Sequence, residues 1–96
     1  MDPDHVALLN AASDYYDKLE FDKALDCVNK VLKQDKTNIL ARNQKASILI
    51  ESWTGEESEI GRVKEAISHL KILCDSDPRN KAVYCYNLCN AFNKIA

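Results

Sequence analysis

The chain has little of the material that builds turns, sheets and membrane spans. Its 96 residues include only two glycines, Gly55 and Gly61, and two prolines. Because β-hairpins depend on such residues at their turns, this composition argues against an all-β fold. No apolar run approaches the roughly 18 residues that would indicate a membrane-spanning helix, so we expect no membrane association. The length predicts one domain covering residues 1–96.

The sequence also lacks an excess of basic residues. Lysine and arginine number 13 and aspartate and glutamate 15, which gives a formal charge of −2. Nucleic-acid binding depends on clustered positive charge, so we expect no nucleic-acid partner.

The four cysteines form neither a CxxC pair nor the spacing of a disulfide framework. The first residues, MDPDH, do not resemble a signal or transit peptide, so we expect reduced thiols in a cytoplasmic protein. Cys85 and Cys89, four residues apart, would supply half of a zinc site. Four ligands are normally required, so we expect core packing and no metal.

What the sequence does contain is helical periodicity from end to end. Apolar residues recur at steps of three and four in five segments, the first of them carrying Val6, Leu9, Ala12, Tyr15 and Tyr16. Thr37 and Asn38 are typical of a helix start and predict the beginning of the third segment. We therefore predict an all-α fold of five antiparallel helices, each of about 14 residues, with no strand.

An internal repeat underlies this periodicity. Ala12 and Ala46 are 34 residues apart, whereas Ala24 and Ala66 are 42 residues apart. The eight additional residues fall within IESWTGEESEIGR, which begins at Ile50. The sequence therefore predicts an insertion in the turn of the second repeat.

A repeat of 34 residues with paired helices resembles the tetratricopeptide repeat (TPR) family. Its small-residue position is filled here by Ala12, Ala46 and Cys89, its aromatic position by Tyr15, Leu49 and Phe92, and its close-packing alanine by Ala24 and Ala66. Lys36 and Lys45 depart from the family pattern, and the third repeat is one residue out of phase.

The resemblance implies a right-handed superhelix of about two and a half repeats. The first repeat would cover about 4–37, and the second about 38–80 with the insertion near 51–60. The first helix of a third repeat would cover about 81–95.

The resemblance also implies a concave groove that binds a peptide or protein segment. On the repeat phase its lining is neutral and rich in asparagine: Asn10, Ser13, Tyr16, Asn43, Gln44, Ser47, Tyr86, Asn87 and Asn90. Amide side chains offer donors and acceptors to an extended backbone, although solvated positions on any helix have the same composition. The cations with which chaperone-binding family members clamp a carboxylate are missing from these positions.

Trp53, the only tryptophan, lies in the insertion. We expect the preceding helix to continue through Trp53, with Gly55 as its left-handed cap. The side chain either packs on the extended end of the first repeat or serves as a binding anchor at the edge of the groove, because tryptophan is enriched in interface hot spots.

No residue pattern indicates catalysis or a cofactor. His5 and His69 have no neighbouring residues that would build a triad, and we expect both on the surface. We therefore expect a protein that is not an enzyme and has no cofactor.

The sequence leaves two further hypotheses about function open. The chain is an N-terminal regulatory or assembly segment of a larger multidomain protein, such as an enzyme, or it is a self-associating scaffold. The last segment carries an apolar stripe of Cys85, Leu88, Phe92 and Ile95 where a sixth helix would pack. Such stripes rarely stay bare, so we expect a homodimer through this C-terminal helix.

Overall fold

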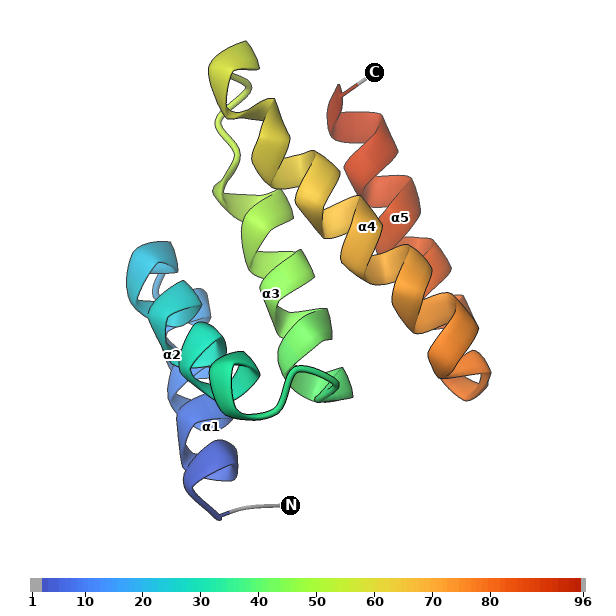
Figure 1. Cartoon of the computed structure of the whole chain (residues 1–96). Helices are drawn as coiled ribbons and strands as arrows, with labels where there is room; N and C mark the ends of the chain where they lie inside the picture. Colours follow the sequence, from blue (N-terminus) through green and yellow to red (C-terminus); the bar gives the residue numbers. More distant parts are fainter. Residues whose placement is uncertain (1–2, 96) are drawn as a thin grey trace.

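The computed structural model describes residues 3–95 and is helical throughout, with no strand in this range (Figure 1). The five α-helices are α1 (Pro3–Asp17), α2 (Phe21–Gln34), α3 (Ile39–Ser52), α4 (Ile60–Ser76) and α5 (Lys81–Ile95). Two short 3-10 helices, η1 (Glu57–Glu59) and η2 (Pro78–Asn80), precede α4 and α5. The predicted five-helix, all-α fold is confirmed.

The helices form two layers. Each α-helix packs against its neighbours in sequence, and α3 also contacts both α1 and α5. Within residues 3–95, the backbones of α2 and α4 do not pack directly against each other, although Leu25 of α2 reaches the cluster of α3, α4 and α5. The odd-numbered helices therefore form one contiguous layer, and the even-numbered helices lie apart on its other side (Figure 1).

Two apolar clusters stabilise this arrangement, and α3 contributes to both. The first cluster joins α1, α2 and α3 around Val28, and the second joins α3, α4 and α5 around Leu70; both side chains are fully buried. Full burial of a valine or leucine side chain contributes roughly 1.5–3 kcal/mol. The alanines predicted at close helix contacts, Ala24 and Ala66, are also fully buried.

Helix α3 begins where Thr37 and Asn38 predicted, with Asn38 as its N-cap. The side chain of Asn38 accepts a hydrogen bond from the backbone N–H of Ala41 at 3.0 Å, and Asn38 itself is buried. Because this bond satisfies one of the free N–H groups at the helix start, it fixes where α3 begins.

The end of α1 uses a left-handed residue that is not glycine. Leu19 has φ 62°, and the N–H groups of Leu19 and Glu20 donate to the carbonyls of Tyr16 and Tyr15. These two bonds form a Schellman cap. Leu19, whose side chain is exposed, adopts this left-handed backbone at a cost in free energy, because its Cβ lies close to the following carbonyl oxygen. Glycine has no Cβ and would avoid this cost.

The predicted phase of α5 is wrong by one residue. Cys89 and Phe92, predicted for the buried small and aromatic positions, are exposed. Leu88 and Ala91 instead face the core, 42 residues after Ala46 and Leu49, so the third segment keeps the spacing found between Ala24 and Ala66.

The contact between α4 and α5 explains why α5 turns Leu88 and Ala91, rather than Cys89 and Phe92, toward the core. Tyr84 is 2% exposed, and its hydroxyl donates a hydrogen bond of 2.6 Å to the Asp77 carboxylate at the end of α4. Burial, together with this bond, raises the pKa of Tyr84 to about 12, so the hydroxyl remains a donor at neutral pH. Fixing Tyr84 inward turns Ala91 inward two helical turns later.

Candidate functional site

A hollow of about 190 Å³ lies between α1 and α3. From α1 it is lined by Ala12, Ser13 and Tyr16, and from α3 by Asn43, Gln44, Ser47 and Ile48. These residues recur at three- and four-residue steps on each helix, which places them on the faces that the two helices turn toward each other.

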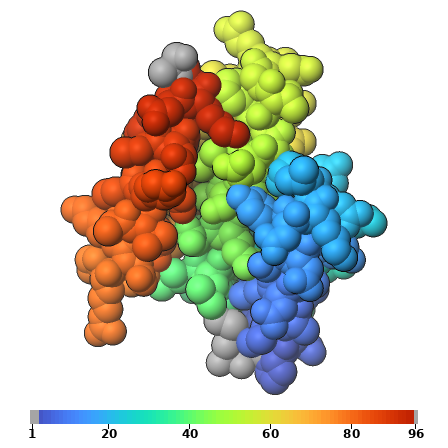
Figure 2. All heavy atoms as spheres, turned by 180° about the vertical axis from the view of Figure 1, so that it is seen from behind, coloured from blue at the N-terminus to red at the C-terminus, as the bar shows by residue number. Residues whose placement is uncertain are grey.

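A second hollow of about 250 Å³ continues from the first toward α5. It is lined by Tyr16, Ser47, Ile50, Glu51, Tyr86, Asn87 and Asn90. Because Tyr16 and Ser47 line both hollows, the two adjoin, and we call them together the groove. On this face α3 lies between α1 and α5 (Figure 2).

The structure brings together every residue predicted for the groove except Asn10. Asn10 is exposed on α1 but lines neither hollow. The prediction also missed Glu51, an exposed carboxylate on the wall of the second hollow. Charge at the groove is therefore confined to one end, while its centre is lined by amides, hydroxyls and apolar groups.

Two hydrogen bonds cross the floor of the groove between helices. The Gln44 side-chain Nε2 donates to the Leu9 carbonyl at 3.3 Å, which ties α3 to α1. The Asn87 Nδ2 donates to the Asn43 Oδ1 at 3.3 Å, which ties α5 to α3. These amides are thus held in fixed orientations by the fold.

Gln44 also carries an unsatisfied acceptor. Its Oε1 atom is buried and has no hydrogen-bond partner among the residues that the structure describes. A buried acceptor without a donor costs about 1–3 kcal/mol. The bond from Nε2 to Leu9 identifies the other amide atom as the oxygen, and this oxygen lies below the surface of the first hollow, which Gln44 lines.

Tyr16 stands where the two hollows meet. Burial raises the pKa of its hydroxyl, and the nearby carboxylates of Glu51 and Asp17 raise it further. The hydroxyl therefore stays protonated at neutral pH and offers a hydrogen bond. The Tyr16 ring packs edge-on against Phe21 at 5.9 Å between centroids, which restrains the side chain.

Lys45, a departure from the TPR pattern, has an electrostatic role away from the groove. Its Nζ lies 3.0 Å from the Glu65 carboxylate of α4, which His69 also contacts at 3.2 Å. Burial alone would raise the pKa of Glu65, but the hydrogen bonds from Lys45 and His69 hold it below its usual value. The Lys45–Glu65 pair joins α3 to α4, and the His69 contact lies within α4.

The histidines are held by structural contacts, and the prediction for His5 is wrong. His5 is 7% exposed rather than at the surface, with Nε2 2.9 Å from the Gln34 side-chain oxygen. The start of α1 buries it because α1 and α2 are antiparallel and bring these two residues together. In the described part of the chain, no three His, Cys, Asp or Glu residues cluster as metal ligands.

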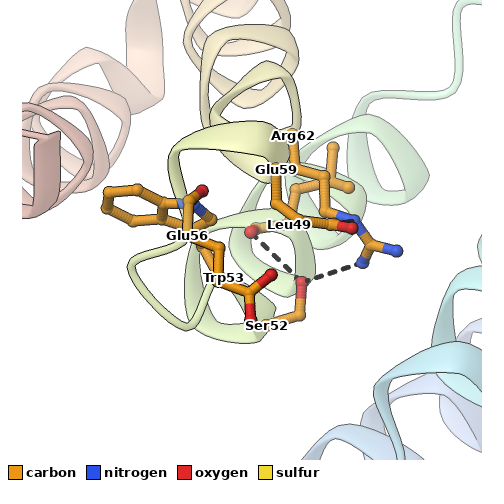
Figure 3. Close-up of polar contacts among 6 residues, drawn as sticks. All are labelled: Leu49, Ser52, Trp53, Glu56, Glu59 and Arg62. Atoms are coloured by element: carbon orange, nitrogen blue, oxygen red, sulfur yellow. Dashed lines mark hydrogen bonds and ion pairs between the residues drawn. The ribbon is translucent and has the colours of Figure 1, made fainter.

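The insertion is fastened to the ends of α3 and α4 (Figure 3). The Ser52 hydroxyl donates to the Leu49 carbonyl at 3.2 Å and accepts from Arg62 at 3.5 Å. Arg62 also pairs with Glu59 at 2.7 Å. These bonds end α3 and position the first turn of α4.

The prediction that α3 continues through Trp53 is wrong. The helix ends at Ser52, and Trp53 has an extended backbone with ψ 125°. Gly55 does adopt a positive φ of 96°, but within the loop rather than as the cap of α3. The Trp53 indole N–H donates to the Glu56 carbonyl at 2.8 Å, which gives the loop its turn.

Trp53 lies outside the groove. Its half-buried side chain packs against the cluster of α3, α4 and α5 rather than on the first helix pair, and it lines neither hollow. The structure therefore places it as a contact that holds the insertion down.

No described helix is both long and apolar enough to cross a membrane. Comparison of the chain with protein-family models, with curated proteins and with solved structures finds no match.

Proposed function

We propose that the chain is a protein-interaction module whose groove binds an extended peptide or protein segment. We further propose a TPR-like right-handed superhelix of two and a half repeats, with α1, α3 and α5 as the inner helices. It acts without a cofactor or catalysis of its own, in the cytoplasm. The observation that carries the proposal is the pair of adjoining hollows, lined largely by amide, hydroxyl and tyrosine side chains of α1, α3 and α5.

Hydrogen bonding to a backbone explains the composition of the groove. A peptide in extended conformation presents an N–H and a C=O at each residue, and amide side chains can satisfy both. Gln44 places an amide in the lining of the first hollow, and Asn87 and Asn90 place two more in the second. A segment that spans both hollows therefore passes amide side chains of α3 and α5 that can bond its backbone.

The tyrosines add apolar contact area. Tyr16 is half-buried between the two hollows, and Tyr86 is exposed on α5 at the wall of the second. Tyrosine combines a flat ring with a polar end and loses little conformational entropy on binding. A segment that spans both hollows would contact both rings.

Replacing Gln44 by methionine is expected to weaken peptide binding at least tenfold, a loss of about 1.4 kcal/mol, because the lining of the first hollow loses its amide. The free energy of unfolding should change by about 1 kcal/mol or less, because the variant removes both the hydrogen bond to the Leu9 carbonyl and a buried unpaired oxygen. The probe is a peptide selected on the wild-type chain from a displayed random library, and affinity is measured by fluorescence anisotropy.

Asn10→Ala is the matched control for this measurement. Asn10 is an exposed amide on α1 outside both hollows, so its variant should bind the selected peptide as the wild type does. Equal affinity of the wild type and Gln44→Met would place the peptide elsewhere on the surface.

Self-association through α5 is a second candidate function, favoured by the outer face of this helix. Cys85, Cys89 and Phe92 are exposed at successive turns, with Phe92 47% exposed. Leu88 and Ile95, which we predicted on the same stripe, are partly buried against the core, so the stripe is narrower than the sequence suggested.

Sedimentation velocity at tens of micromolar tests this candidate. We expect the wild type to form a dimer whose fraction rises with concentration, because a symmetric contact covers the stripe on both copies. Phe92→Glu should remain monomeric, since it places a charge in that contact. A wild type that sediments as a monomer at every concentration contradicts the candidate.

A further inference from the structure

The end of α4 and the start of α5 bring two cysteines together. The hydrogen bond between Asp77 and Tyr84 fixes the height of one helix against the other. Cys74 lies one turn before Asp77 on α4, and Cys85 directly follows Tyr84 on α5. Because α4 and α5 pack together and the Asp77–Tyr84 bond sets their register, Cys74 and Cys85 are neighbours across the two helices, near enough for the Cys85 thiol to act on that of Cys74. Thiols that are neighbours across two packed helices need little backbone movement to be joined.

The two thiols differ in their surroundings. Cys74 is partly buried and packs against the apolar cluster of α3, α4 and α5, whereas Cys85 is exposed. Burial, together with the neighbouring Cys85, raises the pKa of the Cys74 thiol. Cys85 is therefore the sulfur that a reagent in solution reaches first, and Cys74 is placed behind it as the second thiol.

We propose that Cys74 and Cys85 form a thiol–disulfide exchange site whose oxidant is a small-molecule disulfide of the glutathione class. The Cys85 thiolate attacks one sulfur of the oxidant, forms a mixed disulfide and releases one small thiolate, which takes up a proton. The Cys74 thiolate then attacks the Cys85 sulfur and displaces the second small thiolate. The protein loses two protons and two electrons, and the oxidant takes them up and leaves as two thiols.

The product covalently fastens α5 to α4. Helix α5 contacts α3, α4 and η2, and Tyr86, Asn87 and Asn90 on it form a wall of the groove. Elements with few buried contacts open locally more readily than the core. A disulfide that closes the short segment 75–84 restricts this opening, so oxidation would stabilise that wall.

The experiment uses the full chain incubated with glutathione disulfide and digested with trypsin without reduction. Cleavage after lysine and arginine places Cys74 on peptide 72–79, and both Cys85 and Cys89 on peptide 82–94. Because trypsin does not separate these last two cysteines, Cys89→Ser and Cys85→Ser serve as a matched pair. Both positions are exposed, so neither serine variant is expected to disturb folding.

We expect the two peptides to be recovered as a linked pair, lighter by two hydrogens, from the wild type and from Cys89→Ser. The link should be absent from Cys85→Ser and should disappear with dithiothreitol. Amide hydrogen exchange across 81–95 should be slower by about tenfold or more in the oxidised chain, because the cross-link limits local opening.

Two outcomes would overturn the proposal. One is a glutathione adduct that accumulates on Cys85 with no linked pair, which would mean that Cys74 does not reach it. The other is an equal yield of linked peptides from Cys85→Ser, which would assign the reaction to Cys89.

Discussion

Leu70→Ala is expected to lower the free energy of unfolding by about 2–5 kcal/mol, the largest loss that we predict for a single substitution. Leu70 is 0% exposed and lies in the cluster shared by α3, α4 and α5. Removing its side chain loses the transfer free energy of the buried carbons and leaves a cavity that three packed helices can only partly close. Urea denaturation followed by circular dichroism measures the change.

Leu40→Ala is the control for this substitution because it makes the same chemical change where the side chain is 55% exposed. Its effect should stay within about 0.5 kcal/mol, the usual range for surface substitutions. Similar losses from both variants would mean that α4 does not pack against α3 and α5 as described.

Ala66→Leu is expected to destabilise the chain by about 1–3 kcal/mol through overpacking. Ala66 is fully buried on α4, and Ala24 holds the corresponding position on α2, so Ala24→Leu should have a similar effect. The added methylenes have no free space beside a neighbouring helix and force either the side chain or the backbone to move.

Ala82→Leu provides the matched surface substitution, since Ala82 is exposed on α5. Its free energy of unfolding should change by less than about 0.5 kcal/mol. If Ala24→Leu and Ala66→Leu were as mild as this control, the two alanines would not lie at close helix contacts, and the proposed repeat would lose its structural basis.

The five helices could be predicted because each has enough apolar residues at helical spacing to define its buried face. The start of α3 was equally clear, since Asn38 supplies a side-chain acceptor that few other residues match. The end of α1 at Leu19 could not be predicted in this way. Its left-handed backbone depends on the Schellman hydrogen bonds that pull the chain back toward α2, and nothing in a leucine indicates this.

Helix α5 shows where periodicity alone is insufficient. Its sequence has apolar residues on more than one face, so Cys89 and Phe92 were as plausible for the core as Leu88 and Ala91. The buried Tyr84 and its bond to Asp77 decide the rotation, and both depend on the preceding turn. Trp53 was misplaced for a similar reason, because its partner is the Glu56 carbonyl of the loop.

Most of the groove lining followed from the repeat phase that the resemblance to the TPR family implied, and the two errors lie at the ends of the groove. Asn10 is excluded because on α1 the first hollow begins only at Ala12, beyond the point where Gln44 binds the Leu9 carbonyl. Glu51 follows Ile50 on α3 and lines the hollow only because α5 packs beside it. Whether Asn10 and Glu51 line the groove is therefore decided by how the helices pack against one another, which the position of a residue along one helix does not show.

The most direct test of the proposed peptide-binding groove is a selection from a displayed random-peptide library on the wild-type chain, followed by measurement of each selected peptide on Gln44→Met/Asn90→Ala. We expect most selected peptides to bind the wild type and to lose tenfold or more in affinity on the double variant, which should remain folded. Selected peptides that bind both chains equally would contradict the proposed groove.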